Sequence, residues 1–208
     1  MSKEPSLDDL TSKKGWTKIS YDKNIWIPCP NRFPPSLTRQ EWSRGFAEGW
    51  WNAVPGRHSE RQVKALEQTL LYLHDNIYGY QPCHVVLIHL PDARMTALPV
   101  CLGIWQPLGD RDDQLRRLVH ADDPAAVEPP IVEEVRTERL GTGLRSLYHQ
   151  RESDGSGLLT ALNYAWRSEE HETDLRIFCG SPDMARLQRA IPDIEALTRE
   201  ISIVPREA

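Results

Sequence analysis

The stretch from residue 158 to 205 constrains the fold of this chain most. It opens with two extended, β-rich runs that are separated by the polar segment 168–172, a pattern typical of a hairpin with a solvated loop. Ser181-Pro182-Asp183 then reads as an N-cap serine, a proline at the first helical position and an acid in the first turn. A short apolar run at 201–204 ends the stretch. This order predicts a hairpin, a helix and a returning strand.

Two amphipathic helices are predicted earlier in the chain, and each begins with a capping box. Thr38 with Glu41, and Ser59 with Gln62, have the spacing at which two side chains satisfy backbone donors reciprocally. The predicted buried face of the first helix recurs every four residues, and that of the second follows the helical period. These faces comprise Trp42, Phe46, Trp50 and Val54, and Val63, Leu66, Leu70, Leu73 and Ile77, respectively.

The remaining apolar runs predict strands. They lie at 16–21, at 25–27 with Pro28 as the stop, at 83–90, at 100–105, and at 131–139 and 144–149 with the glycines of 141–143 between them. Hairpin connections require antiparallel pairing, and 83–90 is apolar on both sides. We therefore predict one α+β domain over 16–205, with an antiparallel sheet of six to seven strands covered by helices on both faces. Residues 1–15 are predicted to be a flexible tail, and 109–130 an acidic excursion from the core.

Charge and composition exclude several classes of protein. The chain has 208 residues and a net charge of −5 with no long basic run, whereas nucleic-acid-binding proteins cluster Lys and Arg. Its N-terminus lacks the apolar segment of a secretory signal, and no run approaches the roughly 18 apolar residues of a membrane span. The four cysteines lack metal or redox spacing and are expected to be reduced and buried. We expect a cytoplasmic protein that binds neither nucleic acid nor membrane.

No catalytic or metal-binding constellation stands out. Cys83 and His84 are adjacent in a predicted strand, where their side chains point to opposite faces. The nucleophile motif of GxSxG type is absent, and the seven histidines have no ligand spacing. The sequence therefore predicts a non-enzymatic protein with no catalytic residues, no metal and no cofactor.

Aromatic residues supply the candidate binding sites. Seven tryptophans is a high number for this length, and Trp51 follows Trp50 directly in the first helix. Trp51 either covers the junction with the second helix or is a partly exposed anchor for a protein partner. A second candidate is a concave sheet face that would bind an acidic small molecule through one cation. Its residues are Trp105, Arg145, Tyr164 and Trp166.

The order of the motifs resembles a known family. A short Pro-flanked strand (IWIPCP), helices, a strand pair (LGTGLRSLY), the hairpin LNYAWR…DLRIFCGSPD and a closing ISIVP strand are similar to the PsbP/Mog-like α-β-α sandwich, especially its actinobacterial, LpqN-like branch. The resemblance implies a binding or assembly module rather than an enzyme. No family catalytic residue carries over, and the lipoprotein signal of LpqN-type members is not seen.

These observations favour a protein-binding or assembly module. The alternatives are a small-molecule domain that takes an anionic ligand and an accessory chaperone of a secretion system. The predicted edge strand at 16–21 would allow a dimer to form by strand pairing.

Overall fold

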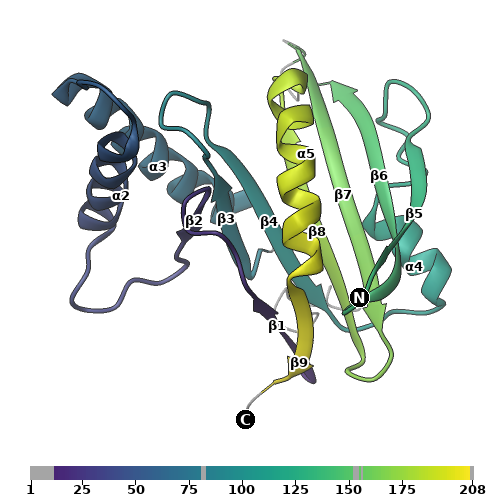
Figure 1. Ribbon diagram of the computed structural model, residues 1–208. Coiled ribbons are helices and arrows are strands. Elements are labelled where there is room, and N and C mark those ends of the chain that lie inside the picture. Colours follow the sequence, from purple (N-terminus) through teal and green to yellow (C-terminus); the bar gives the residue numbers. More distant parts are fainter. Residues whose placement is uncertain (1–11, 81–82, 152–154, 156, 207–208) are drawn as a thin grey trace, which may run out of the picture. The chain divides into compact units, whose positions relative to one another are not determined.

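The computed structural model describes residues 12–80, 83–151, 155 and 157–206, and within them it contains nine strands and four helices (Figure 1). The chain divides into two compact units. One unit consists of residues 22–101, and the other of the residues up to 21 together with those from 102 onward. Each unit is described on its own below.

Seven strands form one antiparallel sheet in the order β2-β3-β4-β8-β7-β6-β5, and β1 pairs with β9 in a separate two-stranded sheet. The strands are β1 (Gly15–Ile19), β2 (Trp26–Cys29), β3 (Val85–His89), β4 (Leu98–Trp105), β5 (Ile131–Thr137), β6 (Gly141–Arg151), β7 (Leu158–Ser168), β8 (Thr173–Ser181) and β9 (Ile201–Pro205). The helices are α2 (Arg39–Ala53), α3 (Glu60–Tyr80), α4 (Arg111–Leu118) and α5 (Met184–Arg199). The predicted α+β class and antiparallel sheet are confirmed.

In residues 22–101, the two helices begin at the predicted capping boxes. The Thr38 amide donates to the Glu41 carboxylate at 2.8 Å, and the Thr38 hydroxyl accepts from the Glu41 amide at 3.2 Å. Ser59 and Gln62 make the same reciprocal pair before α3. Strand β2 continues through Pro28 instead of stopping there, because β2 is the terminal strand of the sheet and its outer side needs no ladder donor.

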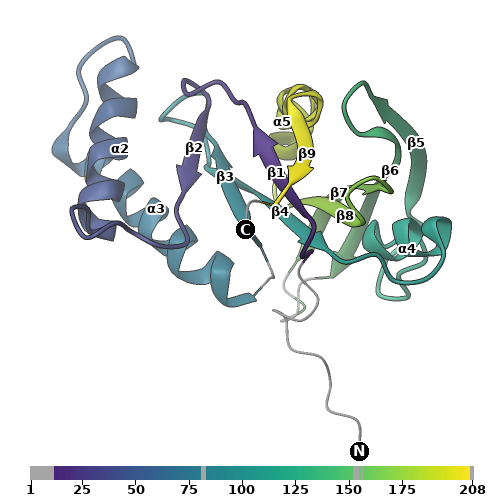
Figure 2. The ribbon, with the colours of Figure 1, turned by 90° about the horizontal axis from the view of Figure 1, so that it is seen from below.

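In the other unit, α4 lies against β6 and β7, and α5 lies against β7 and β8 on the opposite face of the sheet (Figure 2). Residues 109–130 are therefore not the excursion that the sequence predicted. Leu115 and Val119, which are four residues apart and share one side of the chain, are 1% and 0% exposed and pack against Ala165 of β7. Ala126 forms a bridge to Gln150 of β6, so the segment is attached to the sheet here too, although most of residues 122–130 are exposed.

The N-terminal boundary also differs from the prediction. Residues 1–11 of the predicted tail lie outside the described residues. Ser12 is buried, its hydroxyl lies 2.6 Å from that of Thr173, and Gly15 already belongs to β1. The edge strand predicted at 16–21 pairs with β9 over Gly15–Ile19.

Two further boundaries shift for local reasons. The glycines at 141–143 belong to β6, and the turn lies before them. A Cβ on Gly143 would lie 2.5 Å from Cδ1 of Trp166, so glycine is needed for the close approach of this indole. Asp183, not Ser181, is the N-cap of α5, because its carboxylate accepts from the Arg186 amide at 2.9 Å.

Candidate functional site

Helix α2 buries Trp42, as the four-residue repeat predicted, but after Trp42 its buried face differs from the predicted one. Its buried positions are Trp42, Ser43, Ala47 and Trp51. Phe46 and Trp50, which were predicted to lie in the core, remain partly exposed. The buried face is thus turned by about one residue, or about 100°. The cause is α3, which packs against α2 and accepts the Trp51 indole N–H at the Gln62 carbonyl.

The side of α2 that this rotation leaves open lines a groove of about 440 Å³. Phe46 and Trp50 supply aromatic walls, and the segment 91–93 borders the groove from the loop after β3. Gly45 and Gly49 lie in the lining one helical turn apart, and a Cβ added at either would meet no other atom within 4 Å. The missing side chains of these glycines therefore help to keep the groove open.

The walls of the groove are held in place by neighbouring groups. The Trp50 indole donates to the Leu90 carbonyl, and the ring of Trp50 lies 5.7 Å from that of Phe46. At the rim, Asp92 accepts from the Nε of Arg94 at 2.8 Å, and this contact lowers the pKa of Asp92 to about 2. The groove thus combines fixed aromatic walls with a rim carboxylate that is ionised at neutral pH, as in protein-interface pockets.

Trp51, the predicted anchor, is buried instead. It is 6% exposed, and its indole donates to the Gln62 carbonyl at 3.1 Å in the first turn of α3. Its ring centroid lies 6.0 Å from that of His58 in the connection between the helices. Of the two interpretations drawn from the sequence, the structure therefore agrees with the covered helix junction, and the exposed aromatic is Trp50.

The structure brings together three of the four residues of the predicted sheet-face site. Arg145 of β6 lies directly opposite Tyr164 of β7, and the rings of Tyr164 and Trp166 stack at 5.8 Å with an interplanar angle of 4°. Trp105 lies on a strand that is not adjacent to β7, because β8 lies between β4 and β7 in the sheet. The ring of Trp105 lies over Gly103 of its own strand instead.

Three buried polar atoms on this sheet face have no hydrogen-bond partner within the described structure. Tyr164 and Trp166 are 2% and 1% exposed. The Tyr164 hydroxyl, the Trp166 indole N–H and the Arg145 Nε have no hydrogen-bond partner among the residues that the structure describes. Burial raises the pKa of Tyr164 above its ordinary value, whereas the nearby Arg145 cation lowers it by a smaller amount. Arg145 already pairs with Glu133 at 2.8 Å, so its charge is partly satisfied within the chain.

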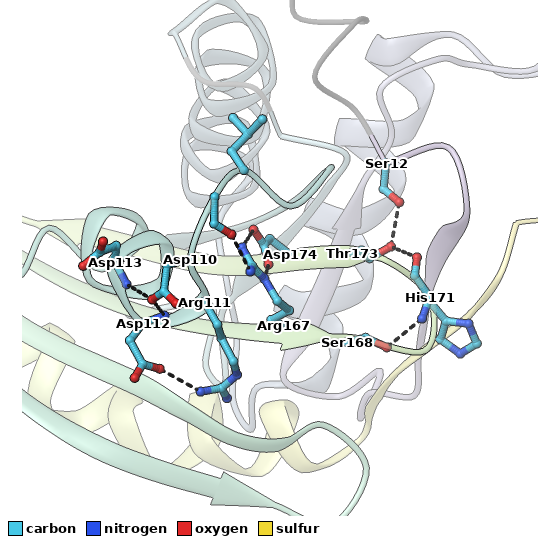
Figure 3. Close-up of polar contacts among 12 residues, drawn as sticks. Ser12, Asp110, Arg111, Asp112, Asp113, Arg167, Ser168, His171, Thr173 and Asp174 are labelled. Carbon is cyan, nitrogen blue, oxygen red and sulfur yellow. Dashed lines mark hydrogen bonds and ion pairs between the residues drawn. The ribbon is translucent and has the colours of Figure 1, made fainter.

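A buried ion pair that was not anticipated lies on the opposite face of β7. Arg167 donates in bidentate fashion to Asp174 at 2.7 and 3.0 Å, and its third donor group reaches the Gly109 carbonyl at 3.1 Å, just before the N-cap of α4 (Figure 3). Asp174 is 0% exposed, and the ion pair raises the pKa of Arg167. Arg167 and Asp174 lie on either side of the predicted hairpin loop and face each other across the strand pair, and their opposite charges are the available sequence signal. Every contact here is internal, so the pair is structural.

A second groove, of about 720 Å³, runs along α4 and is lined largely by charged groups. Several of these charged groups form ion pairs with one another. Arg116 pairs with Asp122 at 2.7 Å, and His120 contacts Asp123 at 2.9 Å. His120 has a φ of 56° and occupies the left-handed position that ends α4, where glycine is usual. Its side chain stacks on Tyr148, and this contact accounts for a histidine at that position.

Metal and membrane features are absent from the part of the chain that the structure covers. Within it, no group of three or more His, Cys, Asp or Glu side chains is arranged to hold a metal ion. None of its helices combines the length and apolarity needed to cross a bilayer. Cys29, Cys101 and Cys179 are buried thiols, and burial raises the pKa of Cys29 and Cys179 to about 12.

Comparisons with known proteins extend the description of the fold. No protein-family model matches the chain, and no curated protein matches it in sequence. Among solved structures, the chain is similar to LpqN, which is described as involved in cell envelope biogenesis of Mycobacterium tuberculosis. The TM-score is 0.52 over 92% of this chain and 84% of LpqN, with 6% sequence identity. The likeness thus supports the LpqN-like part of the resemblance inferred from the sequence, at the level of the fold alone.

Proposed function

We propose that this protein is a non-enzymatic, cytoplasmic binding module whose α2 groove holds an apolar segment of a partner protein. The observation that carries the proposal is the combination of partly exposed Phe46 and Trp50 with the open space beside Gly45 and Gly49. Tryptophan in a shaped pocket is the residue type that contributes most to protein interfaces.

The dimensions and borders of the groove favour a protein segment. A volume of about 440 Å³ accommodates a few apolar side chains, and the groove is open along the helix rather than enclosed. Lys23, Asn24 and Asp92 lie around the apolar part and provide polar groups for the backbone of a bound segment. An apolar centre with a polar rim is the usual anatomy of a protein–protein contact.

The test fills the groove without disturbing the core. Gly49→Leu places a side chain where no atom lies within 4 Å, and leucine favours helix, so the variant is expected to fold normally. Tagged wild-type protein, Gly49→Leu and Gly49→Ala are incubated with extract of the source cells, and bound proteins are quantified by mass spectrometry. The dissociation constant of each purified candidate is then measured by calorimetry.

We expect one partner to bind Gly49→Leu at least roughly tenfold more weakly than wild type, a difference of about 1.4 kcal/mol. Gly49→Ala, the matched control, adds a single methyl group and is expected to stay within a few-fold of wild type. A partner that binds all three proteins equally would show that the groove is not its site.

Small-molecule binding is the second candidate function, and the partnerless polar atoms of Tyr164, Trp166 and Arg145 favour it. Two of these are donors and the third is a hydroxyl, so a carboxylate or another acceptor is the ligand chemistry that they would satisfy. A thermal-shift screen with carboxylates tests this, because a ligand that binds only the folded state raises the melting temperature. A shift that disappears in Tyr164→Phe would locate the ligand there, whereas a flat screen would count against this candidate.

A further inference from the structure

Strand β5 ends the seven-stranded sheet, and its outer edge has no strand partner among the described residues (Figure 1). It pairs with β6 on one side over seven residues, from Ile131↔Leu147 to Thr137↔Gly141. Ile131 is 60% exposed, and the middle of the strand is exposed or partly exposed. An edge of this kind offers a row of backbone donors and acceptors to another strand.

Symmetry limits how two copies of this edge can pair. Antiparallel pairing of two identical strands requires a two-fold axis perpendicular to the sheet. Such an axis keeps each face of one sheet continuous with the same face of the other. Because side chains alternate between faces, residues that lie opposite each other across the axis must face the same way. The axis must therefore pass through a residue, not between two residues.

The charges of β5 select among these residues. An axis at Glu133, Glu134 or Arg136 would place identical charges directly opposite each other, which destabilises a sheet. An axis at Val135 places two valines together and sets Glu134 of each copy opposite Arg136 of the other. We propose that this chain forms a homodimer by antiparallel pairing of β5 with β5 of a second copy, with Val135 on the two-fold axis.

The state of the charged side chains supports this register. Glu134 and Arg136 are exposed, and neither has an ion-pair partner in the described part of the chain. Glu133, which would face Thr137 in this register, is the glutamate that already pairs with Arg145. An axis at Val132 would instead bring Pro130, which has no N–H, into the ladder. The pairing would thus join Glu134 and Arg136, the two charged residues of β5 that form no ion pair within the described part of one copy.

The test uses charge reversal and complementation, measured by sedimentation velocity over a concentration series up to about 1 mM protein, a concentration that detects weak dimers. Wild-type protein is expected to show a monomer–dimer equilibrium. E134R and R136E each convert two opposite-charge pairs into two like-charge pairs, and each is expected to raise the dissociation constant roughly tenfold or more. Arg61→Glu on α3 makes the same charge change as R136E but lies outside the strand, and it is expected to leave the monomer–dimer equilibrium unchanged.

Complementation identifies the register. An equimolar mixture of E134R and R136E restores opposite charges at both crossings and is expected to dimerise like wild type, as is the double variant E134R/R136E. Wild-type protein that stays monomeric throughout the series would overturn the proposal. A dimer that both single variants leave intact, or a loss that mixing does not reverse, would overturn it equally, because the contact would then lie elsewhere or in another register. Neither variant changes the α2 groove, so partner binding is read out separately.

Discussion

The tryptophans of α2 and the tryptophan of β7 occupy contrasting environments. The indole N–H groups of Trp42, Trp50 and Trp51 all donate to backbone carbonyls, those of Pro28, Leu90 and Gln62. Trp166 is more deeply buried than any of these, yet its indole N–H has no partner in the described part of the structure. A buried donor without an acceptor costs roughly 1–3 kcal/mol of desolvation free energy.

The contrast separates two ways in which an aromatic residue contributes to binding. In α2 the polar end of each indole is satisfied, so what Trp50 offers a partner is the apolar surface that remains open. At Tyr164 and Trp166 almost no ring surface is open, and what remains is hydrogen-bonding capacity. The first region suits a protein segment that buries apolar side chains, and the second suits a small acceptor.

The largest expected effect lies on the other face of β7, where the polar groups are fully satisfied. Asp174→Ala leaves the Arg167 guanidinium buried without its carboxylate, so the unfolding free energy is expected to fall by about 3–5 kcal/mol. Urea denaturation measures this loss. A loss below about 1 kcal/mol, the range of exposed ion pairs, would show that water reaches the pair.

Adjacent tryptophans in α2 give the next contrast. Trp51→Ala removes a buried side chain and is expected to lower the unfolding free energy by about 3–5 kcal/mol. Trp50→Ala removes a partly exposed one, with an expected loss of about 1–2 kcal/mol. The same denaturation experiment on both variants is decisive, and equal losses would mean that the groove wall is as much a part of the core as the helix junction is.

Helical periodicity alone does not predict that Trp51→Ala costs more stability than Trp50→Ala, because it assigns Trp50 to the core. The capping boxes at Thr38 and Ser59 are local signals, since each joins residues three apart, and both helix starts were predicted from them. The buried side of α2 is decided by α3, which adjoins Trp51 rather than Trp50. When a helix carries aromatic residues at adjacent positions, its sequence does not decide which of the two neighbouring faces is buried.

The sheet shows the same division between local and distant information. Two extended runs, the second of them alternating, with a polar segment between them are sufficient to predict the β7–β8 hairpin, and with it the antiparallel sheet. Which strands lie next to each other depends on the order of strands in the sheet, and the sequence does not show that β8 separates the strand of Trp105 from that of Tyr164. The sequence does not predict the core position of Leu115, because its acidic, proline-containing surroundings resemble a loop.

Tyr164→Phe tests the second environment directly. The hydroxyl is buried without a partner in the described structure, so its removal is expected to leave the unfolding free energy unchanged or to raise it by about 1–2 kcal/mol. Tyr148→Phe is the matched control, since Tyr148 is also buried but its hydroxyl is not among the buried polar atoms without a partner, and it is expected to lose about 1 kcal/mol. Equal losses in the two variants would show that the Tyr164 hydroxyl is satisfied, for example by a buried water, and would remove the reason to expect a ligand there.

The smallest expected effect separates the groove from the stability of the helix that forms it. Glycine inside a helix is less favourable than alanine by about 0.8–1 kcal/mol, and the methyl group of Gly49→Ala would enter open space. Gly49→Ala is therefore expected to raise the unfolding free energy by about 0.5–1 kcal/mol, measured by urea denaturation beside wild type. A gain of this size would mean that Gly49 costs the folded protein stability, as a residue kept for an open groove would. A loss would mean instead that the space is filled in solution, and the groove would then have no room for a partner.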